Sequence, residues 1–231
     1  MNAPQALRVL HEDEALVIVD KPSGVVVHPG WAQDDGGVLA QVEAHIGQKL
    51  HPLHRLDRGT SGVLLFARHA EAARVLGAAF AEGRVAKCYL ALVRGHPPAQ
   101  VLVDHPVPKT EGGERVPART EVQCLGTWQR YALVKALPHT GRFHQVRRHL
   151  KHLSCPLIGD ANYGKSAHNR YFKEAFGLDR LALHALALRF VHPLSGVTLQ
   201  IVAPPTGGLQ NCFEALGFGS EVAKAAQAPF G

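Results

Sequence analysis

The densest run of polar side chains in the chain is His-Arg-Leu-Asp-Arg-Gly-Thr-Ser-Gly, at residues 54–62. Asp57 lies between Arg55 and Arg58, and the two guanidinium groups should hold the pKa of its carboxyl group below the usual range. Thr60 and the neighbouring glycines favour a tight turn. Two interpretations stay open on spacing alone: an ionised carboxylate presented for chemistry, or an Asx-type turn capped by Asp57.

A second polar cluster, residues 139–152, contains basic and neutral residues and no acidic one. Helical periodicity predicts a helix over residues 143–153. Its apolar stripe consists of Phe143, Val146, Leu150 and Leu153. Three polar residues lie roughly opposite this stripe and can meet phosphates: His144, Arg148 and Lys151.

Arg147 falls on the border of the apolar stripe, so its guanidinium group should be half-buried and need an anionic partner. The alternative for the cluster is a solvated basic face. That alternative explains Arg148 and Lys151 but leaves Arg147 without a partner.

Other chemical signatures are missing from the sequence. It has no glycine-rich dinucleotide or phosphate loop, no Gly-x-Ser-x-Gly elbow, and neither His-Glu-x-x-His nor a Cys/His finger spacing for zinc. We therefore expect no cofactor and no metal. Taken alone, Tyr89 is typical of a strand residue at the edge of a core, and residues 21–24, Lys-Pro-Ser-Gly, of a turn that ends a strand.

The chain has 231 residues, 46% of them hydrophobic, and a formal net charge of +6. This composition excludes a disordered polyampholyte and is compatible with a polyanionic partner. The apolar runs are too short for a membrane span, and residues 1–5 show no secretory signal. The four cysteines are isolated from one another, which favours a reducing, cytoplasmic location.

The pattern of elements predicts an α+β fold, with a mixed, largely antiparallel sheet flanked by helices. Strands are expected at residues 7–10, 16–19, 25–28, 62–67, 89–93, 101–103, 120–125, 130–137, 182–190 and 197–202. Helices are expected at residues 38–46, 70–81, 143–153 and 209–216. We expect a single domain over residues 1–231, with its core at about 7–218 and a flexible tail at 221–231.

Several segments occur together in one order along the chain. They are Asp20–Gly24, the run at 54–62, Lys87–Ala91, Thr140–Arg147, Pro156–Asp160 and Leu183–Ala185. In these segments the chain resembles the RluA-type family of RNA pseudouridine synthases over roughly residues 8–218. The resemblance implies the bent-sheet catalytic domain of that family. The pattern begins almost at residue 7, so the S4-like RNA-binding domain of many members is not expected.

The resemblance also implies roles for individual residues. Asp57 matches the catalytic aspartate, and Tyr89 matches the tyrosine that packs on the uracil and is a candidate for proton removal at C5. Arg147 matches the arginine that pairs with the aspartate, and Arg55 the position that helps to displace the target base. The expected RNA contacts are Arg55, Arg58, Thr60, Arg142, His144, Gln145, Arg148 and Lys151.

The expected reaction isomerises uridine in structured RNA without a cofactor, on a base that has flipped out of its helix. Residues 141–153, 169–172 and 176–181 are similar to a short subgroup of the family that modifies position 65 of tRNA. The alternatives are the same chemistry on 23S ribosomal RNA or at another tRNA position, and an RNA-binding protein without turnover. We expect a monomer with no obligate protein partner.

Overall fold

The computed structural model describes residues 7–28 and 37–231, so the predicted lack of a signal at residues 1–5 lies outside the described residues. The chain divides into two compact units: unit 1 comprises Met1–Val85 and Ala187–Ala203, and unit 2 comprises Ala86–Leu186 and Pro204–Gly231. Each unit combines helices with antiparallel strand pairs, which confirms the α+β class. That the whole chain acts as one catalytic domain stays a prediction.

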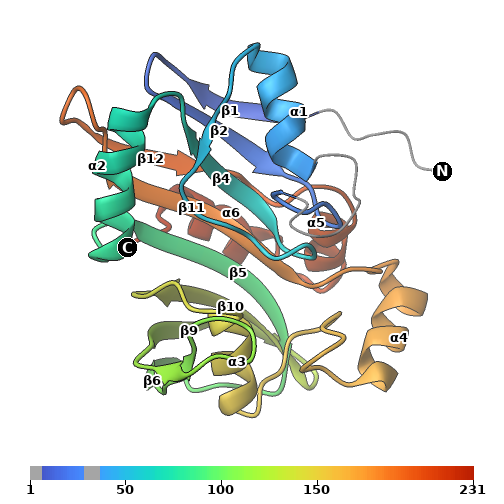
Figure 1. Ribbon diagram of the computed structural model, residues 1–231. Helices are drawn as coiled ribbons and strands as arrows, with labels where there is room; N and C mark the ends of the chain where they lie inside the picture. The colour runs from blue at the N-terminus through green and yellow to red at the C-terminus, as the bar shows by residue number, and fades with distance from the viewer. Residues whose placement is uncertain (1–6, 29–36) are drawn as a thin grey trace. The chain divides into compact units, whose positions relative to one another are not determined.

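Unit 1 is built around β4, whose residues are all buried. Its elements are β1 (Arg8–Glu12), β2 (Leu16–Lys21), α1 (Gly37–Ile46), β3 (His51–Pro52), β4 (Ser61–Ala67), α2 (Ala70–Ala81), β12 (Thr198–Val202) and the Ala187–Val191 part of β11 (Leu183–Val191). The strand order is β1-β2-β4, and Figure 1 shows these three strands side by side. Helix α2 turns Ala72, Leu76 and Ala79 into the core formed with β2 and β4.

One predicted strand of unit 1, at residues 25–28, is wrong. The Val26 and Val27 carbonyl groups instead accept hydrogen bonds from the backbone N–H groups of Val38 and Leu39, both at 2.9 Å. The first N–H groups of a helix have no partner within the helix. The segment therefore caps α1, and this use of its backbone replaces a strand ladder.

Unit 2 has the strand order β5-β10-β9-β6, with β7 and β8 as a separate pair. Its elements are β5 (Ala86–Arg94), β6 (Gln100–Asp104), β7 (Val107–Pro108), β8 (Arg115–Val116), β9 (Arg119–Trp128), β10 (Tyr131–Pro138), α3 (Gln145–His152), α4 (Ser166–Phe176), α5 (Gly207–Ala215), α6 (Gly219–Gln227) and the Leu183–Leu186 part of β11. Val146 and Leu150 of α3 pack into the core beneath β5 and β10. This packing confirms the predicted apolar stripe at these two positions.

Two helices of unit 2 differ from the sequence prediction. Helix α3 begins at Gln145 and not at residue 143, because His144 has the left-handed backbone angle φ 52°. Residues 219–227, mostly expected as a flexible tail, form α6. The end of the chain is held because Ala225 is buried and Lys135 Nζ donates to the Gly231 carbonyl oxygen at 2.8 Å.

Candidate active site

Asp57 lies in the turn that joins β3 to β4, in unit 1. The Thr60 backbone N–H donates to the Asp57 carbonyl oxygen at 3.0 Å, which closes the turn immediately before β4. Leu56 is buried beside it, whereas Arg55 and Arg58 are exposed and Asp57 is half-buried. The turn thus anchors one neighbour of Asp57 in the core and leaves the carboxylate partly open to the surface.

The turn at residues 21–25 holds the backbone that follows Asp57. Lys21 is fully buried, and its Nζ donates to the carbonyl oxygens of Pro22 at 2.8 Å, Val25 at 2.6 Å and Arg58 at 3.3 Å. The Gly24 N–H also donates to the Arg58 carbonyl oxygen, at 2.8 Å. A buried ammonium group is tolerated when such acceptors replace water. Lys21 therefore braces the Asp57 turn, a role that local sequence reading missed.

Two further contacts fix the same turn. Ser23 Oγ donates to the Gly59 carbonyl oxygen at 2.7 Å. His54, at the start of the polar run, accepts the Leu65 N–H on Nε2 at 3.1 Å and stacks on Phe80 with ring centroids 4.9 Å apart. The histidine of the motif is thus a structural anchor to β4 and α2. Thr60, predicted to contact RNA, has its side chain buried in this turn.

Tyr89 lies half-buried on β5 in unit 2, opposite Ala136 of β10. Lys87 is two residues earlier and therefore on the same face of the strand. It is buried, and its Nζ donates to the Thr140 carbonyl oxygen at 3.2 Å. Burial, together with the nearby charge of Arg142, lowers the pKa of Lys87 to about 8. The face of β5 that carries Tyr89 therefore also carries an amine that titrates close to neutral pH.

Gln145 organises the loop that leads into α3. Its Oε1 accepts from Thr140 Oγ1 at 2.6 Å and from the Arg142 N–H at 3.1 Å. Its Nε2 donates to the Arg119 carbonyl oxygen at 2.9 Å and to Thr120 Oγ1 at 3.0 Å. The amide of this buried residue is thus fully engaged with protein groups. Its predicted contact with RNA stays a prediction.

His149 fixes the same helix one turn later. Its Nδ1 lies 2.8 Å from Thr120 Oγ1, and its Nε2 lies 2.9 Å from the His105 carbonyl oxygen. Because a carbonyl oxygen only accepts, Nε2 carries the proton and Nδ1 accepts from the threonine. Burial lowers the pKa of His149, which favours this neutral form. Gln145 and His149 together dock α3 onto the start of β9.

Arg147 has the anionic partner that the sequence required, and it is Asp160. Nε lies 2.8 Å from Oδ2 and Nη2 lies 2.9 Å from Oδ1, so the contact is two-pointed. Burial alone would raise the pKa of Asp160, but the Arg147 bonds and the N–H groups of Tyr163 and Asn162 lower it overall. The pairing of Arg147 with Asp57 stays a prediction. Asp160 ends one of the family segments, at residues 156–160, and nothing in the sequence pattern indicated this pairing.

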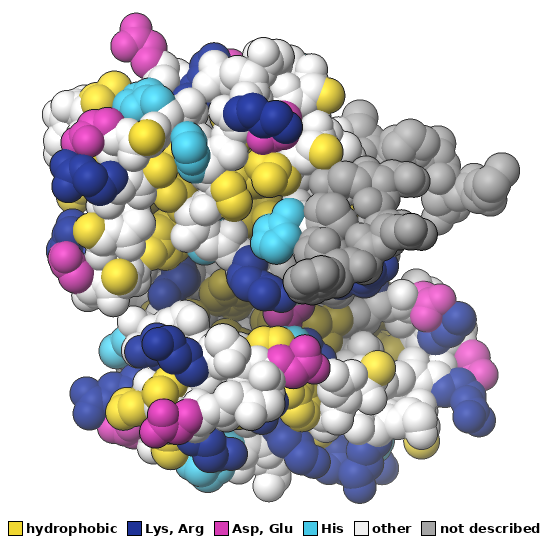
Figure 2. Space-filling model, viewed as in Figure 1, with side chains coloured by type: hydrophobic (Ala, Val, Ile, Leu, Met, Phe, Trp, Pro, Cys, Tyr) yellow, Lys and Arg dark blue, Asp and Glu magenta, His cyan; other side chains and the backbone are white. Residues whose placement is uncertain are grey.

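Aromatic rings surround the basic side chains of α3. The Arg147 and Arg148 guanidinium carbons lie 5.0 Å and 5.1 Å from the centroid of the Tyr163 ring, and Arg148 also lies 5.7 Å from Phe143. His144 Nδ1 is 3.1 Å from the Tyr163 hydroxyl. Arg148 is therefore held by stacking, whereas Lys151 is exposed. In Figure 2, Lys and Arg side chains gather over the part of unit 2 that carries α3 and α4.

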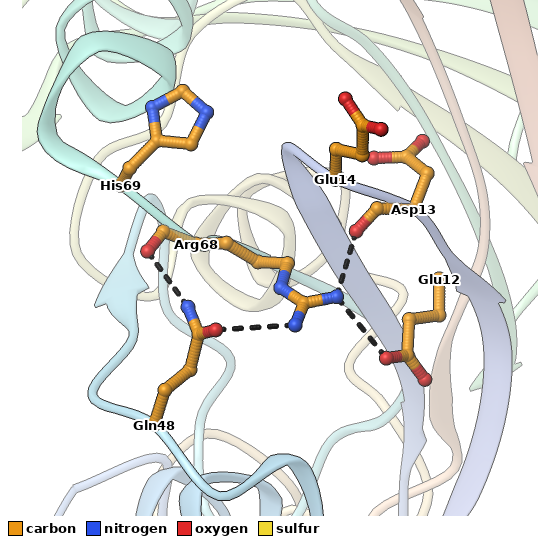
Figure 3. A pocket seen from close by; sticks show the side chains of 6 residues that line it. All are labelled: Glu12, Asp13, Glu14, Gln48, Arg68 and His69. Atoms are coloured by element: carbon orange, nitrogen blue, oxygen red, sulfur yellow. Dashed lines mark hydrogen bonds and ion pairs between the residues drawn. The ribbon is translucent and has the colours of Figure 1, made fainter.

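A surface pocket of unit 1 is lined by other residues: Glu12, Asp13, Glu14, Gln48, Arg68 and His69. Figure 3 shows Arg68 at its centre, donating to Glu12 at 3.2 Å, to the Asp13 carbonyl oxygen at 2.9 Å and to Gln48 at 3.1 Å. These contacts occupy the guanidinium group within the protein. None of the predicted site residues lines this pocket.

Within residues 7–28 and 37–231, no group of three or more His, Cys, Asp or Glu side chains could hold a metal ion. Over the same residues, the helices are too short or too polar to cross a membrane.

The sequence and the structure of the chain are both similar to those of known proteins. A sequence model described as RNA pseudouridylate synthase matches residues 15–152. The tRNA pseudouridine synthase C of Pasteurella multocida (strain Pm70) is 38% identical over 220 residues, which cover 85% of this chain and 90% of the relative. The protein of the same name from Vibrio parahaemolyticus is 36% identical over 245 residues, or 96% of this chain and 100% of the relative.

A solved structure, Human RNA Pseudouridylate Synthase Domain Containing 4, aligns with a TM-score of 0.73 at 28% identity, over 91% of this chain and 93% of that one. This likeness confirms the predicted pseudouridine synthase fold. The matched residues 15–152 include the Asp57 turn, Tyr89 and Arg147. The chain therefore belongs to the RNA pseudouridylate synthase family.

Proposed function

We propose that the chain isomerises uridine to pseudouridine in tRNA, at position 65. Support comes from relatives named tRNA pseudouridine synthase C, which align over most of their length and of this chain. The structural observation that carries the proposal is the Asp57 turn. Asp57 is half-buried and directly follows the buried Leu56. Lys21 holds the backbone that follows it through a hydrogen bond to the Arg58 carbonyl oxygen.

In the proposed reaction the N1–C1′ bond of uridine breaks and a C5–C1′ bond forms. C5 loses its proton and N1 gains one, so the product is an isomer and no redox partner is consumed. Asp57 either attacks C1′ as a nucleophile or removes a proton from the sugar. Tyr89 packs on the uracil and serves proton removal at C5. The chemistry needs no metal or organic cofactor.

Arg147 in this proposal keeps the catalytic carboxylate ionised and oriented, as a preorganised charge. The two-point bond to Asp160 supports this role, because it restricts the rotation of the guanidinium group. The target uracil must leave its helix, at a cost of a few kcal/mol. Arg55 assists this displacement, and the predicted phosphate contacts hold the flanking RNA. We place the reaction in the cytoplasm, with the protein as a monomer.

The test compares Asp57→Asn with the wild-type chain on an unmodified tRNA transcript. We expect the variant to bind the transcript with nearly unchanged affinity and to form no pseudouridine. Asp179→Asn, which changes an exposed carboxylate paired with Lys173, is the matched control and should retain full turnover. Turnover near wild type in Asp57→Asn would remove Asp57 from the mechanism.

The position is tested by mapping pseudouridines in total RNA from cells that lack the gene. Loss of pseudouridine at tRNA position 65 is the expected result. Loss at a ribosomal RNA site or at another tRNA position would contradict the proposed substrate. It would still agree with the proposed isomerisation of uridine.

A further inference from the structure

Three cationic residues of unit 2 neighbour the Tyr131–His168 pair in the sequence or in the strand register. Arg94 ends β5 and lies opposite Tyr131 in the β5–β10 register. Arg130 directly precedes Tyr131, and its carbonyl oxygen accepts the Gly95 N–H at 2.7 Å. Lys165 directly precedes α4, whose first turn carries His168. Arg94 is paired with Tyr131 across β5 and β10. Burial and the charges of Arg94, Arg130 and Lys165 all lower the pKa of His168, so the three cations lie near the same pair of rings.

Three other basic residues of unit 2 pair with acidic side chains, whereas within residues 7–28 and 37–231 Arg94, Arg130 and Lys165 do not. Arg147, Arg119 and Lys173 each pair with an aspartate. Among the described residues, the side chains of Arg94, Arg130 and Lys165 have no hydrogen bond or ion pair. The Nε of Arg94 is buried without an acceptor, which is costly for a guanidinium N–H group. A solvated basic face does not explain that buried donor.

The aromatic pair adds a neutral donor at the same place. Tyr131 Oη lies 2.9 Å from His168 Nδ1. Burial raises the pKa of Tyr131, and burial with the three cations lowers the pKa of His168, so both groups are neutral at pH 7. When the phenol donates to Nδ1, the imidazole proton lies on Nε2 and is available to an acceptor. Tyr171 is 40% exposed, and its ring stacks on that of Tyr131 with centroids 6.4 Å apart.

We propose that Arg94, Arg130, Lys165 and His168 form a phosphate-binding site for the backbone of the substrate RNA. The site is additional to the RNA contacts that the family resemblance implies, and it rests on the proposed function for the identity of the RNA. Cations together with neutral donors are the groups that bind phosphate oxygens. The exposed Tyr171 ring beside them gives a neighbouring base a surface on which to stack. A phosphodiester with its base fits this arrangement better than a free anion does.

The first experiment measures binding of an unmodified tRNA transcript to the full chain at several salt concentrations. Arg130→Gln and Lys165→Gln change exposed side chains and should leave the fold intact. Each should lower the slope of log affinity against log salt by about one unit, and the double variant should lose roughly tenfold or more in affinity at 0.1 M salt. The expected kinetic counterpart is a raised KM with kcat unchanged.

Lys173→Gln is the matched control, because Lys173 is an exposed cation on α4 that is already paired with Asp179. Its slope should equal that of the wild type. If Lys173→Gln reduces the slope as much as Lys165→Gln does, the attraction is diffuse and the proposed site is overturned.

The second experiment titrates inorganic phosphate while the His168 ring is followed by NMR. An anion at the site should raise the pKa of His168 in the wild type and not in the double variant. Suppose that phosphate raises the pKa of His168 but the variants leave the salt dependence of tRNA binding unchanged. That result would assign the site to free phosphate and overturn its role in RNA binding. Because binding is measured without turnover, this failure is distinct from that of the proposed function, which fails if no tRNA gains pseudouridine.

Discussion

Arg147 and Asp160 form a two-point ion pair in the interior of unit 2, with N···O distances of 2.8 Å and 2.9 Å. The side chains are 9% and 0% exposed. Asp160 Oδ1 also accepts the backbone N–H groups of Asn162 and Tyr163, at 2.9 Å and 3.0 Å. The orientation of the guanidinium group is therefore set by the loop that follows Asp160. Asp160 is a positioning residue for the arginine that the proposed mechanism uses.

The first prediction is that Asp160→Asn destabilises the fold and slows the reaction. An amide cannot neutralise the buried arginine, and breaking a buried pair by removing one charge costs roughly 3–5 kcal/mol. We expect kcat to fall more than KM rises, since in the proposed mechanism the arginine keeps the reacting carboxylate ionised. Urea unfolding and steady-state kinetics measure both effects. Asp179→Asn, in an exposed pair, should cost no more than about 1 kcal/mol.

The same pair predicts a dependence of stability on acid pH. The folded-state pKa of Asp160 lies below 3.8, so its ionised form favours folding above the unfolded-state pKa of about 4. That contribution is lost as the pH falls through the lower, folded-state value. The difference in unfolding free energy between wild type and Asp160→Asn should therefore be constant near pH 7 and shrink below about pH 4. A difference that stays constant down to pH 2 would contradict the pairing.

The position of Arg147 on its helix was enough to predict that it needs an anion. Helical periodicity places the residue at the border of the apolar stripe, and in the structure it is buried with an aspartate beside it. The sequence did not identify that aspartate. Asp160 lies in a loop, and helical periodicity cannot predict which loop residue contacts Arg147. Gln145 was predicted to contact RNA, and the structure shows its amide bonded to protein groups. Spacing locates a polar side chain on a helix but does not show which protein groups fill its hydrogen bonds.

The second prediction concerns the hydrogen bonds of Lys21 that hold the Asp57 turn. Lys21→Met keeps the approximate length of the side chain but removes three hydrogen bonds to partly buried carbonyl groups. Leaving such acceptors unpaired should cost roughly 3 kcal/mol of unfolding free energy. Because the Arg58 carbonyl follows Asp57 directly, kcat should fall even where the protein remains folded. Lys49→Met is the control, as Lys49 is 93% exposed in unit 1 and its loss should leave both quantities nearly unchanged.

Kinetic measurements on folded protein decide whether the hydrogen bonds of Lys21 affect the reaction as well as stability. The measurement is single-turnover pseudouridine formation at a temperature well below both unfolding midpoints. A Lys21→Met variant that is less stable but turns over as fast as Lys49→Met would limit Lys21 to stability.

The parts of the fold that the sequence predicted are those with regular burial. β4 and β10 are almost continuous runs of buried residues, and α2 buries Ala72, Leu76 and Ala79 at helical spacing. Helix α4 was missed because Phe172 is its single buried residue, so it has no apolar stripe to detect. Gly177, which ends α4 with φ 63°, was the available signal.

The third prediction uses the amine of Lys87, whose pKa is lowered to about 8 from 10.5. Between these values the unfolded chain binds more protons than the folded one, so stability rises with pH. The shift corresponds to about 3 kcal/mol that is gained as the pH rises from 8 to 10.5. Unfolding of wild type and Lys87→Met should be compared over this range. Their difference should change by that amount, because other groups titrate equally in both proteins, and parallel curves would disprove the shift.

The fourth prediction separates two basic residues of α3 that the sequence treated alike. Lys151 is exposed, so Lys151→Gln should lower the salt slope of tRNA binding by about one unit and leave stability unchanged. Arg148 is stacked on Phe143 and Tyr163, so Arg148→Gln should also cost about 1 kcal/mol of unfolding free energy through lost cation–π contact. Salt-dependent binding and urea unfolding on both variants measure the two effects. Equal stability losses would show that the stacking of Arg148 contributes nothing, and an unchanged slope in Lys151→Gln would show that α3 does not face RNA.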